Sequence, residues 1–142
     1  MVKVTDIFKA DTALKQPFPL YLSRIKAGFP SSAEDYLDKK LDLNEHLIKH
    51  PASTFFVKVK GDSMVGAGIN SGDILIVDRS LDPRDKCIVV AVVNGDFTVK
   101  RICKDSERLF LVAENSKYPA IEINDGMDFE VWGVGVHVIH TV

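Results

Sequence analysis

The hydrophobic positions of the second half of the chain fall in short runs separated by glycine and polar turn residues. Runs of this length, rich in β-branched and aromatic side chains, are typical of β-strands. The expected strands are residues 55–60, 74–77, 88–93, 97–102, 109–112, 121–123 and 130–139. The last contains Gly133 and Gly135, which predicts a bend or a bulge. Many short strands joined by glycine turns indicate a mainly β sandwich or half-barrel.

The dipeptide Asn94-Gly95 lies between two of these runs. Both residues accept a positive φ, so the pair is a strong signal for a tight β-hairpin. The hairpin would bring the strand that carries Lys100 back beside residues 88–93.

Residues 1–30 have scattered apolar positions, and Pro17 and Pro19 interrupt any helix there. We expect a flexible N-terminal arm over residues 1–30 and one β-domain over residues 31–142. Ser31 and Ser32 are helix N-cap residue types, so a short helix is expected to start there. A second short helix is expected to begin at Asp42 and to end before Pro51.

Composition limits the classes of function. The 142 residues carry a net charge of −2, which argues against a dedicated nucleic-acid-binding protein, although basic residues gather in the arm. Cys87 and Cys103 form no CxxC motif, and two free thiols fit the reducing cytoplasm. No apolar run is long enough to span a membrane, and no secretory signal is evident. His46 and His50 lack further metal ligands nearby, so no metal is expected. No other cofactor is expected either.

Ser63, in the sequence Gly61-Asp62-Ser63-Met64, is a candidate nucleophile. A serine hydroxyl needs a neighbouring base, and lysine can act as that base only when its amine is neutral. The free lysine pKa of about 10.4 would have to fall by about 3 units, which requires a buried site. Taken alone, a serine in this sequence is more often a turn residue than a nucleophile.

Lys100 is the candidate base. On a β-strand, Thr98, Lys100 and Ile102 share one face, so Thr98 can orient the Lys100 amine by a hydrogen bond. The alternative is that Lys100 lies on the solvent-facing side of the strand. We expect the backbone N–H of Ser63 to be one oxyanion donor, and the second donor stays open.

Three segments together resemble the LexA/UmuD self-cleaving Ser/Lys peptidase family: residues 61–64, 72–78 and 97–101. The similarity to the UmuD-like branch extends to residues 27–31, 33–36, 42–44, 50–52 and 133–139. The resemblance implies a LexA/signal-peptidase-like half-barrel of the β-clip type. It also implies that Ser63 is the nucleophile and Lys100 the general base, which later acts as the acid. Thr98 and Met64 are expected to support the pair.

The same resemblance implies that the substrate is the chain itself. Cleavage would fall between Ala27 and Gly28 and would leave residues 28–142. It further implies an SOS-response role, in which a RecA–single-stranded-DNA filament stimulates cleavage. The trimmed homodimer would then join a UmuC-like Y-family polymerase subunit in a translesion enzyme of the DNA polymerase V type. Residues 17–21 resemble a segment associated with the polymerase sliding clamp, although an apolar patch that covers the domain is an equal alternative.

Three other classes of protein share some of these sequence features. A LexA-type repressor would need a helix-turn-helix module before the cleavage site, where this sequence has only 27 residues. A signal peptidase would need a membrane anchor. A β-rich interaction domain with an inactive serine and lysine is the third alternative. A cleavage assay separates it from the self-cleaving peptidase.

Overall fold

The computed structural model describes residues 3–12, 17–21 and 37–142. The chain divides into two compact units, one made of Met1–Ala10 with Ala52–Val142 and the other of Asp11–Pro51. This division differs from the boundary at residue 30 expected from the sequence. Within the described residues, no helix is long and apolar enough to cross a membrane.

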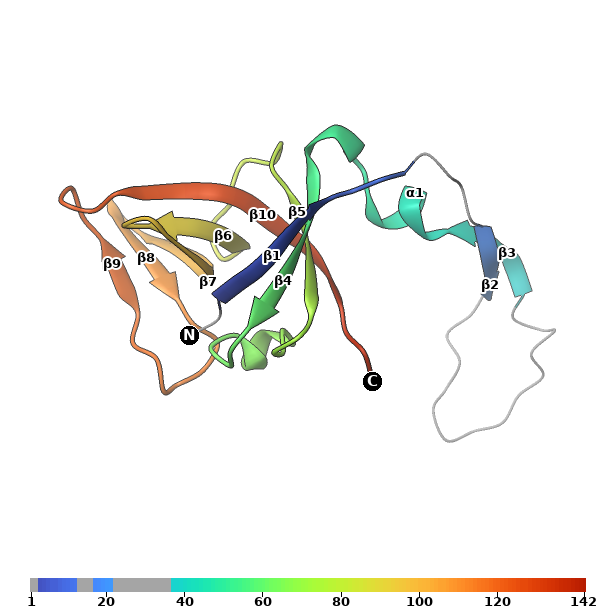
Figure 1. The fold of residues 1–142 in the computed structure, drawn as a ribbon. Helices are drawn as coiled ribbons and strands as arrows, with labels where there is room; N and C mark the ends of the chain where they lie inside the picture. The colour runs from blue at the N-terminus through green and yellow to red at the C-terminus, as the bar shows by residue number, and fades with distance from the viewer. Residues whose placement is uncertain (1–2, 13–16, 22–36) are drawn as a thin grey trace. The chain divides into compact units, whose positions relative to one another are not determined.

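The larger unit is built on one antiparallel eight-stranded sheet with the order β1-β4-β5-β10-β6-β7-β8-β9. Its strands are β1 (Lys3–Lys9), β4 (Thr54–Lys60), β5 (Ile74–Asp78), β6 (Ile88–Val93), β7 (Asp96–Asp105), β8 (Arg108–Val112), β9 (Ile121–Ile123) and β10 (Phe129–Ile139). Two short 3₁₀ turns accompany them, η2 (Pro51–Ser53) and η3 (Val65–Ala67). The sheet curls, so that β1 at one edge also approaches β7 (Figure 1). The mainly β half-barrel predicted from the sequence is confirmed.

The strands from β4 to β10 follow the hydrophobic runs of the sequence. The predicted hairpin is confirmed, since β6 pairs with β7 across Asn94 and Gly95, whose φ angles are 48° and 88°. Asn94 also binds the β9–β10 loop, because its N–H donates to Asp128 O and its Oδ1 accepts from Asp128 N. This turn therefore fixes the register that places Lys100 opposite Val89.

Strand β10 pairs with β5 along one part and with β6 along another, and its register shifts twice, between Val131 and Gly133 and between Gly135 and His137. These shifts confirm the predicted bulge. A Cβ on Gly133 would lie 2.5 Å from Val77 Cγ1 on β5, so only glycine fits this close approach.

Strand β1 was expected to belong to the arm, but it pairs with the edge of β4. Its side chains are mostly exposed; Val4 is half-buried and packs against the core. Because the strand is held mainly by backbone hydrogen bonds, the hydrophobic pattern of residues 3–9 does not predict it.

Two clusters of buried side chains form the core of this unit. One contains Val57, Val59, Met64, Ile69, Leu75, Val77, Val90 and Val99. The other contains Val89, Ala91, Ile102, Leu111 and Val134. Neighbouring residues of β6 and β7 alternate between the two clusters, as the two faces of a strand require.

The smaller unit contains β2 (Pro17–Tyr21), β3 (Leu37–Asp42) and helix α1 (Leu43–Leu47). Strands β2 and β3 pair with each other in an antiparallel ribbon that the sequence did not predict. Helix α1 was predicted, and Asp42 caps it by accepting a hydrogen bond from Asn44 N at 3.0 Å. The helix expected to start at Ser31 begins outside the described residues.

Candidate active site

Ser63 and Lys100 lie side by side inside the sheet unit. Ser63 Oγ is 3.1 Å from Lys100 Nζ. Both residues are buried, with 0 % and 1 % of their surface exposed. The structure thus brings together two residues 37 positions apart and excludes the alternative of a solvent-facing Lys100.

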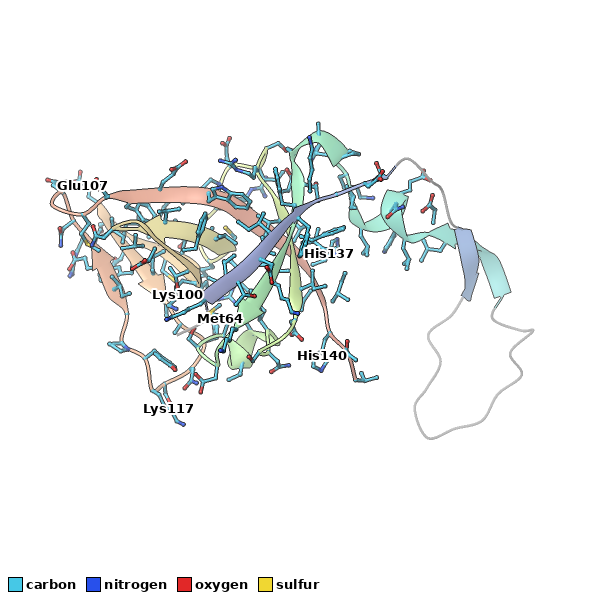
Figure 2. The ribbon with its side chains drawn as sticks, in the orientation of Figure 1. Met64, Lys100, Glu107, Lys117, His137 and His140 are labelled. Carbon is cyan, nitrogen blue, oxygen red and sulfur yellow. The ribbon has the colours of Figure 1, made fainter. Side chains whose placement is uncertain are left out.

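Ser63 is carried on the loop that follows β4. Gly61 ends the strand with a φ of 109°, and its N–H donates to Ser71 Oγ at 3.2 Å. After the serine, Met64 is fully buried in the core, and its carbonyl accepts the N–H of Ala67 at 3.0 Å. Met64 therefore anchors the end of the nucleophile loop in the core. Figure 2 labels Met64 and Lys100 in the same part of the sheet unit.

Lys100 is carried on β7, and three oxygens surround its amine. Besides Ser63 Oγ, the amine is 3.2 Å from Thr98 Oγ1 and donates to Val99 O at 3.3 Å. Thr98, which strand alternation places on the same face, is also buried. It therefore makes the orienting contact considered from the sequence.

Burial lowers the pKa of the Lys100 amine from 10.5 to about 8. The physical cause is desolvation, because an ammonium loses hydration when it is buried, and its three contacts here are with neutral oxygens. A substantial fraction of the amine is therefore neutral near physiological pH. A neutral amine 3.1 Å from a serine hydroxyl can accept the hydroxyl proton.

The connection between β8 and β9 also contacts the loop of Ser63. Asn115 Nδ2 donates to Asp62 O at 3.0 Å, and the Tyr118 hydroxyl donates to Asp62 Oδ1 at 2.5 Å. Gly66 N donates to Glu114 O at 2.8 Å. The hydrogen bond with Tyr118 lowers the pKa of Asp62 and raises the pKa of Tyr118.

These three residues of the connection were missed by sequence reasoning. They lie about fifty positions from Ser63, so no local spacing joins them to it. The only local signal is the turn-forming Asn115, whose Oδ1 accepts the N–H of Lys117 at 3.1 Å.

A pocket of about 530 Å³ borders the site at Thr98. Its walls come from the start of β1, the β6–β7 hairpin and β9, and include Val4, Phe97 and Ile121. Thr98 belongs to this lining, whereas Ser63 and Lys100 do not, so the pocket borders the pair without containing it.

Aromatic and ionisable residues elsewhere in the sheet unit also have structural contacts. Trp132 packs edge-on against Phe55 and Phe97, with Arg79 over its ring. His140 Nδ1 lies 2.6 Å from Asp73 Oδ1. Among the described residues, no group of three His, Cys, Asp or Glu could hold a metal ion. Ala27 and Gly28, the expected cleavage site, lie outside the described residues.

A buried serine–lysine pair on a curled β-sheet is the site of a candidate Ser/Lys hydrolase. Residues 19–136 match the family model described as Peptidase S24-like, and the chain belongs to this family. It is in general terms a self-cleaving serine peptidase.

Several relatives resemble the chain over most of its length. It is 42% identical to Protein MucA of Salmonella typhimurium, over 93% of this chain and 91% of MucA. It is 40% identical to Protein ImpA of the same organism, over 86% of this chain and 83% of ImpA. It is also 35% identical to the LexA repressor of Paracidovorax citrulli, over 83% of this chain and 52% of the repressor.

Proposed function

We propose that the protein cleaves its own N-terminal arm between Ala27 and Gly28, with Ser63 as nucleophile and Lys100 as general base. The observation that carries this proposal is the 3.1 Å contact between Ser63 Oγ and a fully buried Lys100 Nζ. Burial supplies the neutral amine that the chemistry needs, because it lowers the pKa of Lys100 to about 8.

The reaction begins when Lys100 Nζ takes the proton of Ser63 Oγ and Oγ attacks the carbonyl carbon of Ala27. The carbonyl oxygen becomes an oxyanion, and the backbone N–H of Ser63 is its expected donor. As the intermediate collapses, the Lys100 ammonium gives its proton to the leaving nitrogen of Gly28. Ala27 then remains as an ester on Ser63.

Water completes the cycle. Lys100, again neutral, takes a proton from the water, whose oxygen attacks the ester carbonyl. Collapse of this second intermediate returns the proton to Ser63 Oγ and releases residues 1–27 with a new carboxylate. The lasting product is the chain from Gly28 to Val142.

The proposed role of this cleavage is to activate an accessory subunit for SOS mutagenesis. The motifs that resemble the UmuD-like branch support this role, and so does the identity of about 40% to MucA and ImpA over most of the chain. In this scheme a RecA–single-stranded-DNA filament binds the cleavable conformation of the arm better than the others and so raises its population. The trimmed homodimer then joins a Y-family polymerase subunit in the cytoplasm. Contact of residues 17–21 with a sliding clamp belongs to the same proposal.

A LexA-type repressor is the second candidate, because a LexA repressor is among the relatives. Identity is higher to MucA, at 42% against 35%, and the aligned part takes in 91% of MucA against 52% of the repressor. These comparisons favour the accessory subunit.

The proposal is tested by incubating the purified full chain at about pH 9 to 10 and recording its intact mass over time. We expect one cut, after Ala27, and no cut in Ser63→Ala or Lys100→Ala. Lys104→Ala is the matched control, since Lys104 lies on the same strand with an exposed side chain and should leave cleavage unchanged. A chain that stays intact at this pH, with and without RecA filament, would instead be a non-catalytic β-domain.

A further inference from the structure

The connection between β8 and β9 holds the peptide unit that precedes Ser63. Asn115 Nδ2 donates to the backbone carbonyl of Asp62 at 3.0 Å, while the Tyr118 hydroxyl donates to the Asp62 carboxylate at 2.5 Å. Both polar ends of one residue are therefore held from the same connection.

The held carbonyl belongs to the same peptide unit as the N–H of Ser63. This peptide unit is planar and trans, so the Asp62 carbonyl and the Ser63 N–H point in opposite directions. A group that fixes the direction of the carbonyl oxygen also fixes the direction of the N–H. Asn115 contacts the carbonyl edge of this peptide unit, opposite the N–H, so it can orient that donor without contacting a substrate.

The connection is itself tied to the strand of Lys100. Arg101, the next residue along β7, pairs with Glu114 through Nε and Oε1 at 2.5 Å. Asn115 is held in turn, because its Oδ1 accepts from Lys117 N and its carbonyl accepts from Tyr118 N, both at 3.1 Å. These two hydrogen bonds orient the side-chain amide of Asn115. The pair of Arg101 and Glu114 fixes the position of the connection relative to β7. Figure 2 labels Lys117 on this connection.

We infer that Asn115 and Tyr118 are positioning residues, which aim the N–H of Ser63 at the oxyanion formed during cleavage. This inference rests on the proposed function, in which Ser63 N–H is an oxyanion donor. Donors fixed in advance stabilise a transition state because they need no reorganisation as charge develops. Tyr118 holds the side chain of Asp62, and Asn115 holds its carbonyl.

The first test is the rate constant of self-cleavage in Asn115→Ala, measured from pH 6 to pH 10. Loss of a whole oxyanion donor slows such reactions by about 10²–10³-fold, so a donor that is only misdirected should slow cleavage by about tenfold. The pH of half-maximal rate should stay as in the wild type, because Lys100 keeps its surroundings.

Asn124→Ala is the matched control, since Asn124 Oδ1 accepts the N–H of Gly126 in a turn elsewhere, just as Asn115 Oδ1 accepts the N–H of Lys117. An equal fall in both variants, or a shift of the half-maximal pH in Asn115→Ala, would overturn the inference.

The second test uses the hydrogen bond between Tyr118 and Asp62. Tyr118→Phe and Asp62→Ala should slow cleavage by the same factor, and the double variant should be no slower than either single one. Asp62→Asn keeps an oxygen that accepts from the Tyr118 hydroxyl, so it should retain the wild-type rate within about threefold. An Asp62→Asn variant as slow as Asp62→Ala would show that the charge of Asp62 matters instead, and would remove Tyr118 from this role.

A third measurement separates this inference from the proposed function. In the non-cleaving Lys100→Ala background, the Ser63 amide should exchange its hydrogen faster and change its NMR shift when Asn115 is replaced by alanine, but not when Asn124 is. If the wild type cleaves and Asn115→Ala cleaves equally fast, only the inference fails. If the wild type never cleaves, the proposed function fails, and an unchanged Ser63 amide would then reject the positioning role as well.

Discussion

The pH dependence of self-cleavage follows directly from the burial of Lys100. The reactive form of the amine is the neutral one, and its pKa is lowered from 10.5 to about 8. We therefore expect the rate of cleavage to rise about tenfold per pH unit below pH 7, to reach half its maximum near pH 8 and to be level above about pH 9.

The size of the effect can be worked from the same pKa. At pH 7 a lysine of pKa about 8 is roughly one tenth neutral, whereas at the ordinary pKa only about 3 molecules in 10,000 are neutral. Burial thus supplies about 300 times more reactive amine at pH 7. Between pH 6 and pH 9 the neutral fraction rises by about ninetyfold, and the rate should rise with it.

The assay follows intact mass over time at each pH, with RecA absent and circular dichroism recorded on the same samples. A rate independent of protein concentration shows that each event is confined to one molecule or one stable dimer. Ser63→Ala supplies the background rate of hydrolysis. A rate that still climbs tenfold per unit through pH 10 would mean that the Lys100 pKa is not lowered, and would refute the link between burial and reactivity.

The remaining predictions concern stability, and urea or thermal unfolding checks both. In the non-cleaving Ser63→Ala background, the free energy of unfolding should rise with pH between about 8 and 10.5, because the unfolded chain there binds one more proton than the folded chain. This rise with pH should vanish with the further change Lys100→Met. The same change should stabilise the fold at pH 7 by up to about 3 kcal/mol. An equal rise with pH in both chains would contradict the assignment to Lys100. Gly133→Ala should destabilise by about 1–3 kcal/mol, because its Cβ would lie 2.5 Å from Val77 Cγ1. Gly126→Ala, whose nearest neighbour would be 3.5 Å away, should change the midpoint little, and matching losses in the two variants would reject the steric explanation.

Much of the fold could be predicted because each central strand carries its own signal. Hydrophobic runs bounded by turn residues mark β4 to β10, and Asn94-Gly95 marks the hairpin. Asp42 marks the start of α1 in the same local way, as its side chain caps the helix. These features depend on neighbours within a few residues, which is the range that a sequence pattern describes well.

The elements that were missed depend on distant partners. Strand β1 has few buried side chains and is held by the edge of β4, about fifty residues away. Strand β2 contains Pro17 and Pro19, which argue against a strand, but it pairs with β3 alone. An edge strand tolerates proline at positions whose N–H would face away from the partner strand, because no hydrogen bond between the strands is lost there.

The candidate site divides in the same way. By itself the sequence determined which reactive groups are present. These are a serine in a glycine-bounded loop and a lysine on the return strand of a predicted hairpin. It left open whether Ser63 was an ordinary turn residue and whether Lys100 faced solvent. The tertiary structure decided both, since it places Nζ 3.1 Å from Oγ and buries the amine.

The physical reason is that a lysine pKa is set by solvation and by neighbouring groups, which are properties of the packed interior. Only packing brings Thr98 and Ser63 to the amine and excludes water from it. Only packing, too, brings Asn115 and Tyr118 to the loop of Ser63.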